Sequence, residues 1–584
     1  MSLSVFSPIK RLISWVDDRL NPIVVKELRQ AVQGRFVTGV LSLFLTLQIL
    51  VLTVMVLSDV QHVQEGAIGR QVFQTLLFLL LGACMVLIPA HAGQRLAAER
   101  ADSDLDLFFI TAIKPKTIIR GKWLAAVILA LLIYGTCMPF LSFTYLLRGI
   151  DLPSIFCILL IGFGNVVISI GFAIFAGTIP ASGSFRRLID PLGLVGLLMY
   201  FGTVIGILDD LLRSGIGSRI ETWDFFVGSV MCCSLGISTL YILYVFATAM
   251  ISPGTANRAF PVRRAVTVVW MISGGLCFFV CYSDPTSSWD RAFEFWGWMT
   301  AMACFPAVGA AISEREEWGP RLRREIPLGY FRRAIAFLFF SGACGGLLWA
   351  ALLQFSTCLI VSFFSPWQSP FAGTPSTHFT PSKSGYFISA LLGPSYGVTK
   401  LSDLQQIAGI GIFALAYGLT TLGIRKNLFP DVVPRHSGWI MMAICLVLFS
   451  VSPQMVGYLI SDGREPMLRV LNPFMLADSE WGHLSFLFGF FWLTGVTFFS
   501  LPWIFRQVKG FIPYEASPIK DLPTGHILPT NSIFEPGGTL QSAIGSGDAA
   551  KIPDDSDDSD DSDDSDDSVK ISADTDVIHE KPHE

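Results

Sequence analysis

Residues 123–147 read WLAAVILALLIYGTCMPFLSFTYLL, an apolar run without a single charged side chain. A helix of about 20 residues crosses the roughly 30 Å hydrocarbon core of a bilayer, so this segment is long enough to span a membrane. The stretch before it, 99–122, reads ERADSDLDLFFITAIKPKTIIRGK and is rich in charge. Basic residues are held back on the cytoplasmic side during insertion, so we expect this loop in the cytoplasm.

The same alternation continues through the 584 residues, of which 52% are hydrophobic and only 15% charged. A soluble chain of this length would leave too much apolar surface in water. The sequence therefore predicts an all-α polytopic membrane protein with about twelve transmembrane helices. The spans are expected near 37–57, 72–92, 123–147, 154–180, 188–208, 225–251, 265–282, 292–312, 334–364, 404–424, 437–460 and 482–505.

Four parts follow from this pattern: a cytoplasmic amphipathic segment (1–36), a first six-span half (37–251), a second six-span half (252–512) and an acidic cytoplasmic tail (513–584). Within the first part, Pro22 suits the first position of a helix that would lie on the inner leaflet, with Val24 and Leu28 on its apolar face. The tail contains repeats of Asp-Asp-Ser, which repel one another and bury no core, so we expect disorder there.

Lys and Arg gather in alternate loops, which sets the expected orientation. The segments predicted to face the cytoplasm are 10–35, 95–122, 186–187, 258–264, 315–333, 425–435 and 506–520. The opposite loops hold far fewer basic residues. The charge rule then places both termini in the cytoplasm and the chain in the cell (inner) membrane as a multi-pass protein.

Several kinds of chemistry are missing from the sequence. Asp190, Asp209 and Asp210 fall at span ends, which argues against a proton-driven or sodium-driven transporter. The chain has no phosphate-binding Gly-x-x-x-x-Gly-Lys-Ser/Thr loop, no Gly-x-Ser-x-Gly elbow and no His-Glu-x-x-His helix. We therefore expect no enzyme activity, no catalytic residue, no metal site, no cofactor and no nucleic-acid partner.

A weak internal repeat links the two halves. Span two ends in Glu99-Arg100 and span eight in Glu314-Arg315; a polar stretch follows each pair, with Pro115 or Pro327 before the next span. Duplication of a six-span unit and chance similarity stay open as equal alternatives.

The loop 99–122 resembles the loop between spans two and three in the membrane (permease) subunit of type-2 ABC exporters. In that family the loop opens with Glu-Arg, continues as a short coupling helix and closes with Thr, Pro and Gly-Lys. The residues that match, with Phe108 extending the apolar face, are Glu99, Arg100, Leu105, Asp106, Leu107, Phe108, Thr111, Pro115, Gly121 and Lys122. Ser103 and Asp104 stand where the family usually has Gly-Thr, which puts the start of the coupling helix in doubt.

The resemblance extends over residues 1–250 and implies a permease that forms the translocation path of an exporter. It implies as partners the lipid bilayer, a separate ABC ATPase that would contact the coupling loop, and a second permease copy or a second permease subunit. A second coupling loop, with Glu314, Arg315, Glu316 and Pro327, is a further hypothesis; an ordinary basic loop that obeys the charge rule is its alternative.

Two functions from other classes remain open. The chain could be a membrane scaffold, without transport, whose basic loops and acidic tail recruit cytoplasmic proteins. It could also be an intramembrane enzyme on lipid-linked substrates, for which the outer loop 365–403 offers His378, Lys383 and Tyr386 but no paired carboxylates. Recovery of an ATPase with the chain separates the exporter from both. The sequence does not indicate the transported substrate.

Overall fold

A computed structural model describes most of the chain up to residue 513. The described residues are 22–59, 68–101, 114–147, 150–180, 183–215, 222–253, 256–283, 292–364, 403–428, 438–460, 470–477 and 482–513. They all belong to the first of two units, Met1–Ser517, and the second unit, Pro518–Glu584, lies outside them. The predicted acidic tail therefore lies almost wholly outside the described residues.

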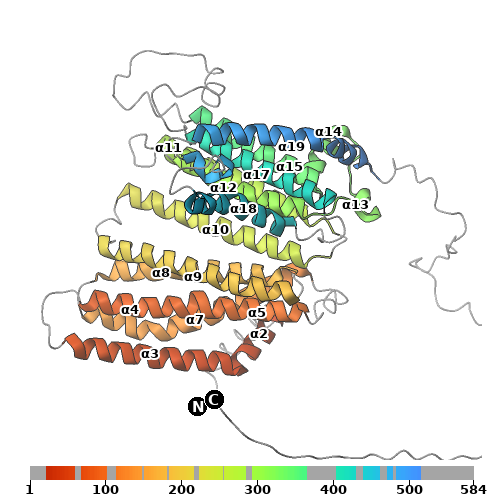
Figure 1. Ribbon diagram of the computed structural model, residues 1–584. Coiled ribbons are helices and arrows are strands. Elements are labelled where there is room, and N and C mark those ends of the chain that lie inside the picture. The colour runs from red at the N-terminus through yellow and green to blue at the C-terminus, as the bar shows by residue number, and fades with distance from the viewer. Residues whose placement is uncertain are drawn as a thin grey trace, which may run out of the picture. The chain divides into compact units, whose positions relative to one another are not determined.

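Long apolar helices account for nearly all of the regular structure in the described ranges (Figure 1). They are α3 (Arg35–Asp59), α4 (Ile68–Gly82), α5 (Ile88–Ala101), α7 (Pro115–Leu146), α8 (Leu152–Thr178), α9 (Gly183–Ser214), α10 (Trp223–Ile251), α11 (Ala259–Ser283), α12 (Ala292–Ile312), α15 (Ala343–Phe364), α17 (Asp403–Asn427), α18 (Gly438–Ile460) and α19 (Gly482–Gly510). The shorter elements are α2 (Pro22–Gln33), η1 (Ala83–Leu87), α13 (Pro320–Arg324), α14 (Tyr330–Phe339) and η5 (Pro473–Ala477).

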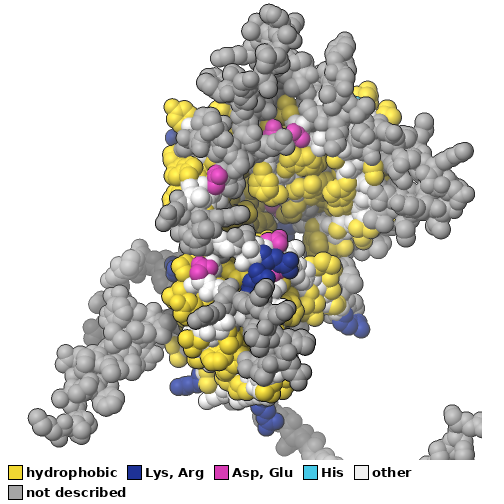
Figure 2. Space-filling model, turned by 90° about the vertical axis from the view of Figure 1, so that its left-hand side faces the viewer, with side chains coloured by type: hydrophobic (Ala, Val, Ile, Leu, Met, Phe, Trp, Pro, Cys, Tyr) yellow, Lys and Arg dark blue, Asp and Glu magenta, His cyan; other side chains and the backbone are white. Residues whose placement is uncertain are grey.

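Within the described part of the chain, eleven helices are long and apolar enough to cross a membrane, which confirms the predicted all-α polytopic class. The segment predicted at 437–460 forms α18, in which the stretch Gly438–Ser450 is apolar but shorter than the eleven spans. Large apolar side chains such as Leu160, Phe499 and Met199 are highly exposed, and a surrounding bilayer would cover them. Figure 2 shows hydrophobic side chains over much of the described surface at one end of the helices.

The ends of several observed helices differ from those of the predicted spans, and two of these differences have a clear cause in the structure. The second consists of α4, the π-helical turn η1 and α5, and it continues past residue 92 to Ala101 because Leu96 is buried and holds the polar end of α5 against the protein. The ninth was predicted at 334–364, but α15 begins only at Ala343 and α14 precedes it as a separate helix. At this break Phe340 adopts an extended conformation, which ends α14.

Buried side chains form two large clusters. The first contains residues between Val37 and Ile251, among them Phe73 and Met85, and the second contains residues between Cys277 and Phe486, among them Phe413. A smaller cluster contains Trp318, Phe337 and Phe340 from the segment between α12 and α15, together with Phe511 after α19. The domain boundary expected near residue 252 stays a prediction.

The closest helix packing in the first cluster is between α5 and α8. A Cβ atom added at Gly93 would lie 2.7 Å from the backbone oxygen of Ala173, and one at Gly177 would lie 2.6 Å from that of Gly93. Small residues allow two backbones to approach in this way, which is how helices commonly associate inside membranes. The contact holds the end of α5, and with it Glu99 and Arg100, against α8.

Candidate functional site at the basic end of the helices

Alternate helix ends meet on one side of the molecule, where α2, α13 and α14 also lie (right-hand side of Figure 1). We call this side the basic end, and the buried or half-buried cations that the structure describes there are Arg95, Arg100, Lys122, Arg186, Arg258, Arg263, Arg323, Arg333, Arg425 and Lys426. At the opposite end, Arg70 and Arg213 are the basic residues that the structure describes. The helices therefore place the predicted cytoplasmic segments on one side.

Lys122 is the centre of the ionic network in the first half. Its ammonium group lies 2.7 Å from a carboxylate oxygen of Glu99 and 2.7 Å from one of Glu27. Arg95 adds longer contacts of 3.8 Å to Glu27 and 3.9 Å to Glu99, and it also contacts Gln30. The side chains of Lys122 and Glu27 are only 9% and 10% exposed, so water screens this pair weakly.

The network joins three helices because of where the sequence places each charge. Glu27 faces the protein together with Ile23 and Val24, whereas Val32 on the same helix is 62% exposed. Glu99 lies in the last turn of α5. Lys122 lies about two turns into α7, which begins at Pro115, a residue that suits the first helical position. The two ends of the predicted coupling loop are thus tied to each other and to α2.

Half of the predicted coupling-loop residues lie outside the described residues: Leu105, Asp106, Leu107, Phe108 and Thr111. The structure describes the others, Glu99, Arg100, Pro115, Gly121 and Lys122, and brings Glu99 and Lys122 together. Gly121 is buried beside Lys122 in α7.

Arg100 faces the carbonyl ends of two other helices. Its guanidinium donates a hydrogen bond to the backbone oxygen of Thr178 at the end of α8, and a longer one of 3.5 Å to that of Met250 in the last turn of α10. Unpaired carbonyls and the helix dipole make such ends partly negative, so a cation stabilises them. The Glu-Arg pair therefore connects α5 to α7 through Glu99 and to α8 and α10 through Arg100.

A second network surrounds Glu314, just beyond α12. Its carboxylate lies 2.6 Å from the Arg263 guanidinium and accepts a 2.6 Å hydrogen bond from the Gly342 N–H. Arg263, 3% exposed, also donates to the backbone oxygens of Leu338 at 2.7 Å and Phe340 at 2.8 Å. These side chains satisfy backbone groups that the break between α14 and α15 leaves free, which explains why the predicted span is interrupted there.

Glu316 ties the same segment to the last helices. It lies 2.7 Å from Lys426 and 3.4 Å from Arg425, and it accepts a 3.2 Å hydrogen bond from the Trp503 indole. Arg425 in turn donates a 2.7 Å hydrogen bond to the backbone oxygen of Ile312, at the end of α12. Glu314 and Glu316, two residues apart, thus fasten α12 to α11, α17 and α19.

The other two residues predicted for the second coupling loop, Arg315 and Pro327, make fewer contacts than Glu314 and Glu316. Arg315 is exposed, and Pro327 is half-buried, with its carbonyl 3.4 Å from Arg333. Next to Pro327, the side chains of Tyr330 and Phe331 are 88% and 79% exposed. The segment therefore has an anchored side and an uncovered aromatic side.

Burial shifts the pKa of two described ionisable groups that lie outside the membrane spans, Glu314 and Arg258. It raises the pKa of the Glu314 carboxyl, and the Arg263 charge and the Gly342 N–H counteract part of that rise. It lowers the pKa of the Arg258 guanidinium, and the charge of Arg315 adds to this. Arg258 remains a cation at neutral pH because arginine starts from so high a pKa.

Sequence reasoning did not single out Glu27, Arg95 or Arg263 as partners. Glu27 gives a signal in hindsight, since it falls on the face of α2 that also carries Ile23 and Val24. Arg263 gives none, because in sequence it is one of several arginines in a basic loop. Within the described ranges, no three His, Cys, Asp or Glu side chains gather in a way that could hold a metal ion.

The helices and the basic end define a class, the multi-pass α-helical membrane proteins. Comparison of the chain with protein-family models, curated proteins and solved structures finds no match.

Proposed function

We propose that this chain is the permease-type membrane subunit of an ABC exporter, which forms the translocation path and couples to a separate ATPase. The observation that carries the proposal is the 2.7 Å ion pair between Glu99 and Lys122, which closes the base of the loop that resembles a coupling helix. A coupling helix that is moved by an ATPase needs a firm attachment to the spans that it moves. The ion pairs of Lys122 with Glu99 and Glu27 supply this attachment.

The contacts of Arg100 extend that attachment. A displacement of the loop would reach α5 and α7 directly, and α8 and α10 through the carbonyls of Thr178 and Met250. Nucleotide-driven closure of the ATPase could then shift several spans together, as coupled transport requires. In this proposal the basic end faces the cytoplasm of a cell (inner) membrane, in accordance with its excess of Lys and Arg.

The segment between α12 and α15 is proposed as a second contact for the ATPase or for a second permease subunit. Its support is the anchored side built on Glu314 and Glu316, together with the exposed Tyr330 and Phe331. Aromatic side chains that are exposed next to arginines are common in protein interfaces.

The test is affinity purification of the tagged full-length chain in mild detergent, with mass-spectrometric identification of any ATPase that accompanies it. A variant with Leu105, Leu107 and Phe108 all changed to Asp should lose the ATPase, because charges would replace the apolar contact face. A control variant with Leu198, Met199 and Ile207 of α9 changed to Ala alters exposed apolar residues away from the basic end and should retain it. Absence of an ATPase from the native chain in every detergent would refute the exporter and favour a scaffold.

A further inference from the structure

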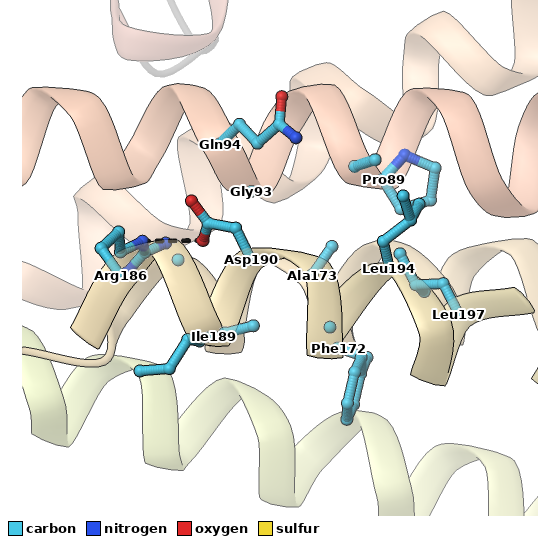
Figure 3. A pocket seen from close by; sticks show the side chains of 14 residues that line it. Pro89, Gly93, Gln94, Phe172, Ala173, Arg186, Ile189, Asp190, Leu194 and Leu197 are labelled. Atoms are coloured by element: carbon cyan, nitrogen blue, oxygen red, sulfur yellow. Dashed lines mark ion pairs between the residues drawn. The ribbon is translucent and has the colours of Figure 1, made fainter. Parts of the chain in front are cut away.

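A narrow groove lies between α5, α8 and α9 (Figure 3). Small residues on α5 and α8, Gly93, Ala173 and Gly177, make room for it, and larger apolar side chains from Phe172, Leu194 and Leu197 line it. All three helices belong to the candidate membrane spans, so lipid can reach this region. The groove thus has a mostly apolar lining and lies among helices that are candidate membrane spans.

One end of the groove is polar. Arg186 and Asp190, one turn apart on α9, form a 2.8 Å ion pair there, and Gln94 of α5 also lines the groove (Figure 3). Arg186 also lies 3.3 Å from the backbone oxygen of Ile179, just after the end of α8. A phospholipid has an apolar acyl chain joined to a charged headgroup, and the groove has an apolar part followed by a charged end in the same order.

Two further arginines adjoin this polar end. Arg100 donates to the oxygen of Thr178, the residue before Ile179, and to that of Met250. Arg258 donates to the oxygen of Ser252, two residues beyond Met250. Contacts with adjacent carbonyls thus bring Arg100, Arg186 and Arg258 together at the ends of α8 and α10.

Among the residues described at this place, positive charge exceeds negative charge. Among the ion pairs between described residues, Asp190 is the acidic partner for these arginines, and it pairs with Arg186. Arg258 has its Nε atom buried without a hydrogen-bond partner in the described structure. Neighbouring guanidinium groups that share a single paired carboxylate repel each other, and a bound anion would relieve the repulsion.

We propose that this groove and the adjoining arginines, Arg100, Arg186 and Arg258, bind an anionic phospholipid. Its phosphate lies at the arginines and an acyl chain lies along Phe172, Leu194 and Leu197. Basic pockets between transmembrane helices recognise acidic headgroups by this combination of charge and apolar contact. The occupant is a lipid rather than a free anion because the charged end continues into an apolar groove. The inference does not depend on the proposed export function.

The test measures lipid binding to the full-length purified chain in detergent, by native mass spectrometry and by the thermal unfolding midpoint. The probes are dioleoylphosphatidylglycerol, dioleoylphosphatidylcholine and inorganic phosphate. We expect phosphatidylglycerol to be retained and to raise the midpoint, because a ligand that binds only the folded state stabilises it. Arg258→Gln should weaken that binding about fivefold, the effect of about 1 kcal/mol for one basic residue near a headgroup.

The groove is tested separately from the arginines. A Cβ atom at Gly193, which lines the groove, meets nothing within 4 Å, so Gly193→Phe should fold normally while it fills the space that the acyl chain needs. Gly206→Phe is the matched control, since Gly206 lies on the same helix with equally open surroundings but outside the groove. We expect loss of phosphatidylglycerol binding in the first variant alone.

Three outcomes would overturn the proposal. Equal retention of phosphatidylcholine and phosphatidylglycerol would remove the role of the arginines. A midpoint shift with inorganic phosphate equal to that with phosphatidylglycerol would make this a free-anion site. Unchanged binding in a folded Gly193→Phe would place the lipid elsewhere. Arg213→Gln removes a charge about 40 Å away along α9 and should leave binding unchanged.

Discussion

Glu99 and Lys122 lie 2.7 Å apart, although 22 residues stand between them in the sequence and they belong to different helices. Lys122 is shared with Glu27, so that one ammonium group forms ion pairs with two carboxylates on two other helices. An amphipathic segment at the start of the chain is in this way attached to the same point as both ends of the predicted coupling loop.

Removal of the shared cation should destabilise the first half. Lys122→Met leaves Glu27 and Glu99 with only the longer contacts to Arg95, and we expect the free energy of unfolding to fall by about 1–3 kcal/mol. Tryptophan fluorescence during thermal unfolding in detergent measures the change. Arg213→Gln breaks a pair whose arginine is 67% exposed and should cost below about 1 kcal/mol. Equal losses in the two variants would contradict the special position of Lys122.

Substitution of Arg263 should destabilise the protein far more than substitution of its neighbour Arg264. Arg263→Met leaves a buried carboxylate at Glu314 without its cation and frees the carbonyls of Leu338 and Phe340, so we expect a loss of about 3–5 kcal/mol or failure to fold. Arg264→Met changes the next residue, whose side chain is exposed near Phe260, and should be tolerated. Size-exclusion profiles and thermal midpoints compare the two, and a more stable Arg263→Met would show that the network is dispensable.

Because α5 and α8 pack so closely, we expect the addition of one methyl group at Gly93 to destabilise the protein. Gly93→Ala would place its Cβ atom 2.7 Å from the Ala173 oxygen and force the helices apart, with an expected loss of about 1–3 kcal/mol. Gly164→Ala on α8 meets nothing within 4 Å and should be neutral or slightly stabilising. Thermal unfolding of both proteins decides this, and a neutral Gly93→Ala would mean that the two backbones are not packed so closely.

The orientation can be tested with introduced cysteines in sealed vesicles. Leu328→Cys at the basic end should react with an impermeant maleimide only from the cytoplasmic side, and Arg213→Cys only from the other side. Peptide mapping by mass spectrometry separates these positions from Cys232 and Cys233, which are exposed in the structure. The reverse pattern would invert the proposed orientation, and labelling of both positions from one side would contradict the helix arrangement.

Much of the fold was predictable because the bilayer imposes simple requirements. A segment such as 123–147 can only be a helix in hydrocarbon, where every backbone N–H and C=O must be bonded within the segment. Helix ends were less predictable: α5 continues to Ala101 because of packing by Leu96, and α15 starts at Ala343 because Glu314 and Arg263 satisfy the backbone at the break. Such contacts join residues that are far apart in the sequence, so no local sequence pattern predicts them.

The amino-acid sequence by itself determined the membrane class, the approximate spans and which segments carry the basic residues, since hydrophobic length and charge act locally along the chain. It also marked Glu99, Arg100 and Lys122 as residues of interest through a family resemblance. Only the tertiary structure decided that Glu27 joins Lys122 and that Arg263 meets Glu314. It likewise decided that Arg100, Arg186 and Arg258 gather beside one groove, because these relations depend on which helices pack side by side.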